Sequence, residues 1–242
     1  ASVSWVASDE SFFPQPDWLN LFRVRAAWGA SGRQPSSTAA IQTLSVDAIA
    51  DPDDNIVSGV NLGASGNVDL KPEKSSEIET GFDADMFGGR VGLAFTWFRR
   101  TTTDIIVNEP LPPSLGPSSS RSQNLGKART QGFELGIGAT VLSTDQIQWD
   151  LNVSGSKLSS ELLALGLVGV DFLGTTERHA PGFPLGSSFD YPVTWADANG
   201  DGLIAVSEVT VGAEREFIGP GLPQREFSLG TTLRFGDLFQ VY

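Results

Sequence analysis

Hydrophobic and polar side chains alternate with a period of two residues along much of this chain. Such alternation places the apolar side chains on one face of a β-strand and the polar side chains on the other. Six segments follow this pattern: 22–29, 77–86, 91–98, 133–141, 147–154 and 226–235. The sequence therefore predicts an all-β protein whose antiparallel strands each have one apolar face and one polar face.

The length of these segments favours a membrane-spanning barrel over a soluble β-sandwich, whose strands alternate in the same way. Several segments reach about nine to eleven residues, which is the length of a tilted transmembrane strand. Their polar faces carry Gly, Asp, Glu, Asn and Gln more often than Lys, which suits a water-filled interior. Aromatic residues lie towards strand ends, where barrels have interfacial girdles: Trp28, Trp97, Phe98 and Phe235.

The connections between the predicted strands are alternately short and long. Tight turns are expected at 86–90, 142–146 and 235–238, and long polar connections at 31–74, 102–127 and 156–223. Outer-membrane barrels combine short periplasmic turns with long extracellular loops in this way. The pattern thus predicts an antiparallel transmembrane β-barrel segment of about seven or eight strands, with residues 156–223 forming a long extracellular loop.

Composition excludes several classes of function. The 16 Lys and Arg residues stand against 29 Asp and Glu, which gives a net charge of −13 and disfavours nucleic acid as a partner. With no Cys and one His, the chain lacks thiol chemistry, disulfides and multi-His metal centres. It has no apolar run long enough for a transmembrane helix, no signal peptide in residues 1–6 and no catalytic motif. We therefore expect a protein that is not an enzyme.

Several segments, in order, resemble signatures of TonB-dependent outer-membrane transporters. Residues 67–77 (NVDLKPEKSSE), followed by Gly81-Phe82-Asp83, resemble the end of a loop and the start of a late barrel strand in that family. Residues 124–135 (NLGKARTQGFEL) resemble its next signature, and residues 22–29 an earlier strand. Residues 110–113 (PLPP), and residues 197–202 (DANGDG) followed by 218–223 (IGPGLP), are similar to the SusC/RagA-like branch.

The resemblance implies a barrel of about twenty-two strands, plugged by an N-terminal domain and driven by the TonB complex in the outer membrane of a Gram-negative bacterium. Residues 1–242 would form a partial barrel, without the plug domain and the final strands. The expected partners are the rest of the barrel and plug, the TonB complex, a SusD-like surface lipoprotein and outer-membrane lipid. The expected function is to supply barrel wall and extracellular gating loops for import of a nutrient such as an oligosaccharide or a peptide.

Two other functions fit the same strands. One is a calcium-stabilised β-sandwich that binds carbohydrate, and the other is a scaffold subunit in a larger membrane assembly. Detergent dependence separates the sandwich from a membrane barrel, because a soluble, monodisperse chain would not have lipid-facing strands.

Residues 197–208 fit the calcium-loop template D-x-[DN]-x-[DN]-G-x5-E at every position. That template needs oxygen ligands at positions one, three, five, seven and twelve and a Gly at six for the sharp turn. The candidate metal ligands are Asp197, Asn199, Asp201, the Leu203 carbonyl and Glu208, with Gly202 at the turn and water beside Ala205. The alternative is an Asp/Asn/Gly turn that binds no cation.

Two aromatic residues precede this loop, Tyr191 and Trp195, and they are the candidate ligand-binding residues because aromatic rings stack on sugars. Packing within the long loop is the equally weighted alternative. Residues 51–55 (DPDDN) are interpreted as a solvated acidic loop tip in preference to a second cation site, and His179 as a loop residue in preference to a ligand or base.

Overall fold

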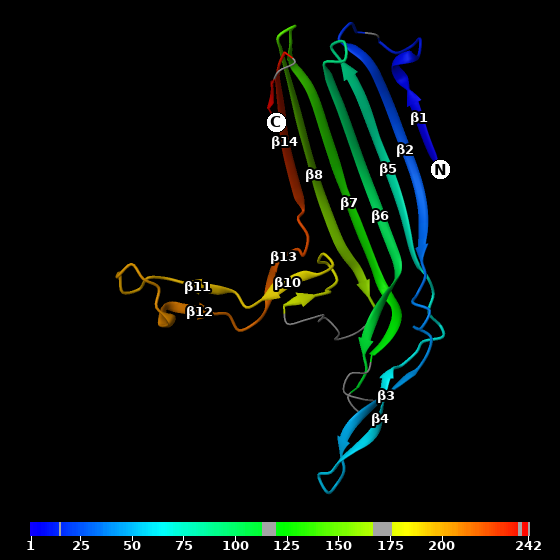
Figure 1. The fold of residues 1–242 in the computed structure, drawn as a ribbon, viewed down its shortest axis with the longest axis vertical. Coiled ribbons are helices and arrows are strands. Elements are labelled where there is room, and N and C mark those ends of the chain that lie inside the picture. The colour runs from blue at the N-terminus through cyan, green and yellow to red at the C-terminus, as the bar shows by residue number, and fades with distance from the viewer. Residues whose placement is uncertain (15, 113–119, 167–175, 237–238, 242) are drawn as a thin grey trace.

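The computed structural model describes residues 1–14, 16–112, 120–166, 176–236 and 239–241 of the chain. Pro113, residues 167–175 of the predicted long loop and residues 237–238 of the third predicted turn lie outside the described residues. Eight strands form an antiparallel sheet in the order β1–β2–β5–β6–β7–β8–β14–β15 (Figure 1). Their bounds are β1 Ser2–Val6, β2 Leu19–Arg33, β5 Glu73–Met86, β6 Val91–Pro110, β7 Ser120–Ser143, β8 Ile147–Leu165, β14 Arg225–Phe235 and β15 Phe239–Val241.

The strands expected from the alternation and the tight turns expected at 86–90 and 142–146 are confirmed. All six alternating segments lie within β2, β5, β6, β7, β8 and β14, and each of these strands pairs antiparallel with its neighbours. The β5–β6 turn has three consecutive residues with positive φ, namely Phe87 at 57°, Gly88 at 67° and Gly89 at 83°. Glycine adopts such angles without the steric cost of a Cβ, which explains the Gly-Gly pair in this turn.

The strands extend further than the sequence predicts. Because β6 continues to Pro110 and β7 begins at Ser120, most of the expected loop 102–127 is paired strand. Similarly, β8 continues to Leu165, so the long connection does not begin at Ser156. The alternation breaks down in the outer parts of these strands, where apolar residues are adjacent, as at Ile105 and Ile106 or Leu162 and Leu163, although the backbone hydrogen bonds continue.

β1 was not predicted, because five residues are too few for a clear alternation. Its Ser2–Val6 segment pairs with β2, and the amino group of Ala1 donates to the Trp28 carbonyl at 2.7 Å. A short 3-10 helix, η1 (Ala7–Asp9), then leads to the Pro-containing connection before β2. The N-terminal segment thus adds an edge strand to the sheet.

The long connections carry smaller elements at the end of the sheet opposite the tight turns (Figure 1). Between β2 and β5, strands β3 (Thr43–Ala50) and β4 (Ile56–Ala64) form a hairpin, and Ala64 pairs in parallel with Ser120 at the start of β7. The connection between β8 and β14 contains a three-stranded sheet and a two-stranded arm. These elements are β9 Glu177–Arg178, β10 Ser187–Asp190 and β13 Glu216–Gly219, then β11 Val193–Trp195, η3 Val206–Glu208 and β12 Val209–Val211.

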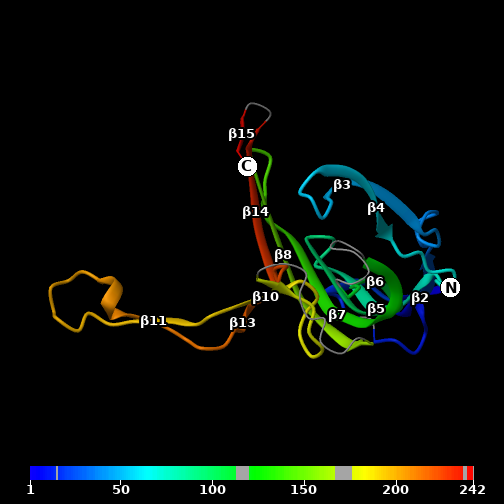
Figure 2. The same ribbon diagram turned by 90° about the horizontal axis from the view of Figure 1, so that it is seen from below.

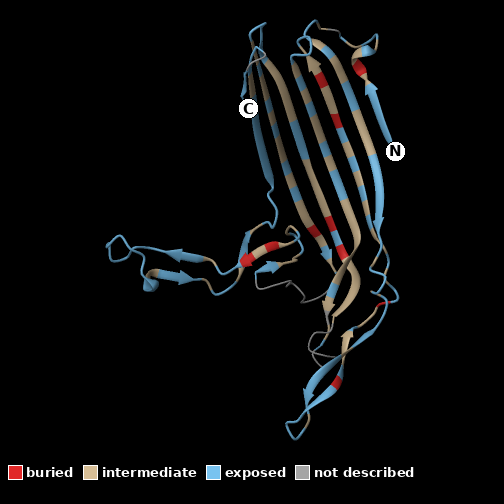
Figure 3. Ribbon diagram, viewed as in Figure 1, coloured by how far each residue is buried: buried red, intermediate tan, exposed pale blue. Residues whose placement is uncertain are grey.

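The sheet curves, and its two faces differ in character. Large apolar side chains such as Val24, Leu135, Phe227 and Leu229 are exposed on one face, and little of the described sheet is buried (Figure 3). Neither smaller sheet covers this apolar face (Figures 1 and 2). The β-sandwich alternative is therefore wrong, since a sandwich buries that face against a second sheet.

Two further observations concern closure and helices. The edge strands β1 and β15 do not pair with each other among the described residues, so the sheet is an open, curved segment. No helix in the described part of the chain is long and apolar enough to cross a membrane.

Candidate functional site

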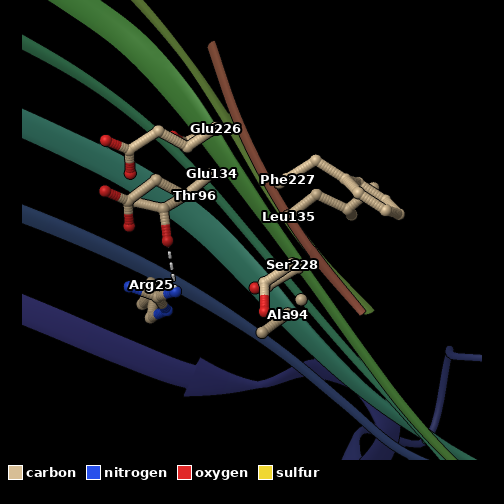
Figure 4. Close-up of a pocket in the computed structure, with 12 residues that line it drawn as sticks. Arg25, Ala94, Thr96, Glu134, Leu135, Glu226, Phe227 and Ser228 are labelled. Carbon is tan, nitrogen blue, oxygen red and sulfur yellow. Dashed lines mark hydrogen bonds between the residues drawn. The ribbon is translucent and has the colours of Figure 1, made fainter. Parts of the chain in front are cut away.

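The polar side chains of successive strands line up in one row across the concave face of the sheet. Register pairing places six residues side by side on β2, β5, β6, β7, β8 and β14: Arg25, Gly81, Thr96, Glu134, Ser156 and Glu226. Figure 4 shows Arg25, Thr96, Glu134 and Glu226 on one side of the strands, with Leu135 and Phe227 on the other. Successive side chains of a strand therefore point alternately to the polar and the apolar face, as the sequence pattern predicts.

Two hollows lie on this concave face. The larger has a volume of about 740 Å³ and is lined by Arg25, Thr96, Glu134, Ser156 and Glu226 among others. The second, about 520 Å³, is lined by small residues of neighbouring strands: Gly92, Ala94, Gly136, Gly138, Ser154, Ser228 and Gly230. Small side chains leave space beside the sheet, so the hollows result directly from the Gly-, Ala- and Ser-rich polar face.

The charges of the larger hollow are partly paired. Asp83 accepts hydrogen bonds from Arg23 at 3.0 and 3.1 Å and lies 3.3 Å from the Arg25 Nε. Arg25 also crosses Gly81 to donate to the Thr96 hydroxyl at 2.6 Å. Glu134 and Glu226, at the other side of the hollow, make no hydrogen bond or ion pair with the described residues. The hollow thus has a basic side, where two arginines share the carboxylate of Asp83, and an acidic side whose carboxylates have no cationic partner among the described residues.

The concave face carries a further ion pair near the loop end of the sheet. Glu77 of β5 accepts from Arg100 of its register partner strand β6, at 2.7 and 3.0 Å. Both side chains are partly exposed, so this pair contributes little stability, but it fixes the position of charge on the polar face.

Asn124 and Asn67 attach the segment between β4 and β5 to the outer ends of β6 and β7. The Asn124 side chain donates to the carbonyls of Lys71 and Asp104 and accepts from the Lys71 N–H, each at 2.8 Å. Asn67 donates to the Ser122 carbonyl at 2.9 Å, and the Glu73 carboxylate accepts from the Ile106 N–H at 2.9 Å. Asn67 and Asn124 belong to the segments 67–77 and 124–135 that resemble family signatures, but the sequence does not reveal that Asn124 of the second segment binds the main chain of the first.

The three-stranded loop sheet has a small aromatic core. Phe183, Phe189 and Phe217 pack with ring centroids 5.0–5.7 Å apart, and Arg178 lies over Phe189 at 5.4 Å. His179 accepts a hydrogen bond from the Gly186 N–H through Nδ1 at 3.1 Å. Burial lowers the pKa of His179, and the opposing effect of the Glu177 carboxylate is smaller. His179 is thus a neutral structural residue of the loop, as expected.

The predicted ligand-binding aromatics lie on the arm formed by β11 and β12. Tyr191 is half-exposed with the Arg215 guanidinium 5.4 Å from its ring centre, and Trp195 is 66% exposed at the end of β11. Figure 2 shows this arm pointing away from the concave face. Tyr191 and Trp195 are therefore accessible but remote from the two hollows.

The predicted calcium loop forms a compact turn at the tip of this arm. Asp197 accepts from the N–H groups of Gly200, Asp201 and Gly202, at 2.7–3.2 Å. Glu208 accepts from Ala198, Asn199 and Ala205, and these bonds lower its pKa, the Ala205 N–H most strongly. Asn199 and Asp201 bond each other, and Gly202 has a positive φ of 80°.

The carboxylates of this loop point to main-chain donors. Within the described part of the chain, no group of three or more His, Cys, Asp or Glu side chains has an arrangement that could hold a metal ion. The Leu203 N–H donates to Asp201, and the role of the Leu203 carbonyl stays a prediction. At the tip of β3–β4, Asp51 likewise accepts from the N–H groups of Asp53 and Asn55, and the Asn55 N–H is the main cause of its lowered pKa.

A curved antiparallel sheet with a wet, hollowed concave face and an uncovered apolar convex face defines the wall of a transmembrane β-barrel. Comparison with known proteins agrees. The family profile described as "TonB dependent receptor-like, beta-barrel" matches residues 1–239. The chain belongs to this family, and so it is a barrel segment of a TonB-dependent receptor in the outer membrane of Gram-negative bacteria and not an enzyme.

Curated relatives place it near the SusC and RagA branch. It is 24% identical to the TonB-dependent receptor P26 of Formosa agariphila over 100% of this chain and 27% of P26. It is 22% identical to the TonB-dependent receptor SusC of Bacteroides thetaiotaomicron over 62% of this chain and 16% of SusC. The chain thus spans about a quarter of P26 and less of SusC.

Solved structures show the same fold. The "closed-closed" state of the RagAB peptide importer superposes with a TM-score of 0.77 over 97% of this chain and 27% of the importer chain, at 17% identity. The "open-open" state gives a TM-score of 0.74 at 19% identity, with the same coverage. At these identities the likeness concerns the fold of the barrel segment.

Proposed function

We propose that this chain supplies part of the barrel wall and the extracellular loops of a TonB-dependent importer. The concave face lines the lumen, the convex face contacts outer-membrane lipid, the tight turns face the periplasm and the long connections face the outside. The observation that carries this proposal is the exposed apolar face opposite the polar one, with Leu135, Phe227 and Leu229 uncovered, because a barrel wall has lipid on one face and water on the other.

The imported compound is a nutrient such as an oligosaccharide or a peptide. Support comes from the relatives, because SusC belongs to the same family and the RagAB structures are those of a peptide importer. By the same reasoning the partners are the rest of the barrel and its plug, the TonB complex and a SusD-like surface lipoprotein. Selection is steric and electrostatic, with the hollow between Arg25 and Glu226 as part of the path.

We also propose that residues 197–208 bind calcium at the tip of the arm. The sequence supplies an oxygen ligand at each required position, and Gly202 has the backbone conformation that the template requires at position six. Binding requires that Asp197 and Glu208 exchange some of their main-chain donors for the cation.

Uptake by the bacterium that makes the full-length receptor tests the transport proposal. Deleting the receptor should abolish energy-dependent uptake of one oligosaccharide or peptide class, and deleting TonB should have the same effect. The double change Glu134→Gln and Glu226→Gln should alter uptake without loss of receptor from the outer membrane. If deletion leaves uptake of every tested class unchanged but disrupts a membrane assembly, the scaffold role replaces the proposal.

A further inference from the structure

The hairpin formed by β3 and β4 presents an aliphatic face that no described residue covers. Register pairs Leu44 with Leu62 and Val46 with Val60, and Ala50 with Ile56, so these side chains share one face. Leu44, Val46, Ile56 and Val60 are between 64% and 74% exposed. These four residues form the aliphatic face of the hairpin.

The opposite face of the hairpin holds its two strands together. Asp47 accepts from Ser45 at 3.1 Å and from Asn61 at 3.0 Å, which joins β3 to β4. Ile49 lies over Gly59, where a side chain larger than hydrogen would meet it. The contacts of this face join β3 to β4, and they leave the aliphatic face exposed.

The hairpin is also fixed at its base, on the concave side of the sheet (Figure 2). The Asn67 N–H donates to the Ala39 carbonyl at 3.0 Å and closes the base, and Asn67 and Asn124 attach the following segment to β6 and β7. In a closed barrel the concave side is the lumen side. The aliphatic face is therefore carried on a firmly attached hairpin beside the entrance of the lumen.

Both chemistry and charge of the hairpin favour a peptide as the occupant. The outer edge of β3 has no strand partner among the described residues, and an unpaired edge can bind an extended peptide through main-chain hydrogen bonds. Residues 43–64 contain no aromatic residue on which a sugar could stack. Their charged residues are Asp47, Asp51, Asp53 and Asp54, with no Lys or Arg, so cationic side chains are favoured.

We infer that the β3–β4 hairpin is a capture site for an extended peptide with apolar and basic side chains, bound along the β3 edge and against the aliphatic face. This inference rests on the proposed importer function and names the substrate class for it. On one side, the alternating side chains of the bound strand contact Val46 of β3, beyond which Val60 of β4 continues the apolar surface, and its basic groups lie near Asp53 and Asp54.

Fluorescence anisotropy on the detergent-solubilised full-length receptor tests the inference. The probe is a labelled short peptide of alternating valine and threonine between terminal lysines. Val46→Thr with Val60→Thr keeps β-branched residues but removes apolar contact area, so binding should weaken at least about tenfold. The matched control is Val209→Thr with Val211→Thr, which changes exposed valines on the β11–β12 hairpin and should leave binding unchanged.

Three further measurements test whether the site binds peptide main chain, sugar or basic side chains. A peptide N-methylated on every internal residue should bind weakly, because neither of its edges can donate hydrogen bonds to the β3 edge, and maltohexaose should not compete. Asp53→Asn with Asp54→Asn should reduce binding of the lysine peptide and remove its salt dependence. Resistance to proteinase K, which can cut within the Lys- and Arg-free hairpin, at the wild-type level shows that the variants keep their fold.

The inference is overturned if the Val46/Val60 variant binds the probe as the wild type does, or if maltohexaose competes for the site. It is also overturned if that variant loses only a co-purifying lipoprotein, because the face then belongs to a protein partner. The importer proposal is tested separately: if uptake remains energy-dependent and requires the receptor, that proposal holds even when the capture site is disproved. Absence of receptor-dependent uptake would remove the importer proposal itself.

Discussion

The side-chain amide of Asn124 pairs with the main chain of Lys71 as a strand residue would, accepting from its N–H and donating to its carbonyl, both at 2.8 Å. The same amide also donates to the carbonyl of Asp104, a residue with a positive φ of 58° at a break in the β6–β7 register. One side chain thus satisfies three main-chain groups from two segments that are remote in sequence. An asparagine at this position of β7 therefore has a physical reason, because its side-chain amide supplies both an acceptor and donors.

Replacing Asn124 by aspartate should loosen this attachment. Asn124→Asp keeps the acceptor for the Lys71 N–H but loses both donors, at a cost of about 1–3 kcal/mol for the two unsatisfied carbonyls. Amide hydrogen exchange in residues 65–72 should accelerate by about tenfold or more. Asn108→Asp is the control, because Asn108 only accepts from Ser122 and keeps that role as aspartate. Equal exchange in both variants would contradict the proposed attachment.

Gly81→Ala should destabilise the sheet. A Cβ at this position would collide with the Phe95 carbonyl and come within 3.3 Å of the Arg25 guanidinium carbon, which crosses Gly81 to reach Thr96. Because the backbone must shift, we expect a loss of about 1–3 kcal/mol in the free energy of unfolding, measured by urea titration in lipid vesicles. Gly136→Ala, also on the concave face but with nothing within 4 Å of its Cβ, should be neutral or slightly stabilising.

The loop around His179 should lose stability in acid. Burial lowers the pKa of His179 in the folded loop, so the unfolded loop binds more protons below about pH 6.5. The stability that the neutral ring provides is present above that pH and is lost as the pH falls towards the lower, folded pKa. Protonation of Nδ1 also breaks the bond from the Gly186 N–H. The chain has one His, so a single imidazole NMR signal reports the titration, and a pKa at or above the ordinary value would refute the prediction.

Calcium should change the fluorescence of Trp195, which lies directly before the loop 197–208. Titration to about 10 mM should give a saturable response, because loops of extracellular modules bind in the millimolar range. Glu208→Gln removes a charged ligand and should abolish the response, whereas Glu214→Gln, an exposed glutamate of the same arm, should retain it. A flat titration of the wild type would show that the loop is a turn without a cation.

The central strands could be predicted because water on one face and lipid on the other impose a strict alternation, as in residues 147–154. The outer ends of β6, β7 and β8 could not, because the alternation breaks down there: β7 begins with five polar residues at 120–124, and β8 has adjacent apolar residues at Leu162 and Leu163. The β3–β4 hairpin was likewise hidden inside a connection. The contact of Arg25 with Thr96 depends on the register of three strands, which no local pattern encodes.

The most direct test of the barrel wall uses the absence of Cys in this chain. Single cysteines introduced at each position from Leu151 to Ser156 in the full-length receptor are labelled with a nitroxide in lipid vesicles, and collisions with oxygen and with a nickel chelate are measured. If the convex face contacts lipid, nitroxides at positions 151 and 153 should collide preferentially with oxygen, whereas those at positions 152, 154 and 156 should collide with the nickel chelate. Equal access of the chelate to all positions, with no period of two, would contradict a lipid-facing convex surface and a wet concave one.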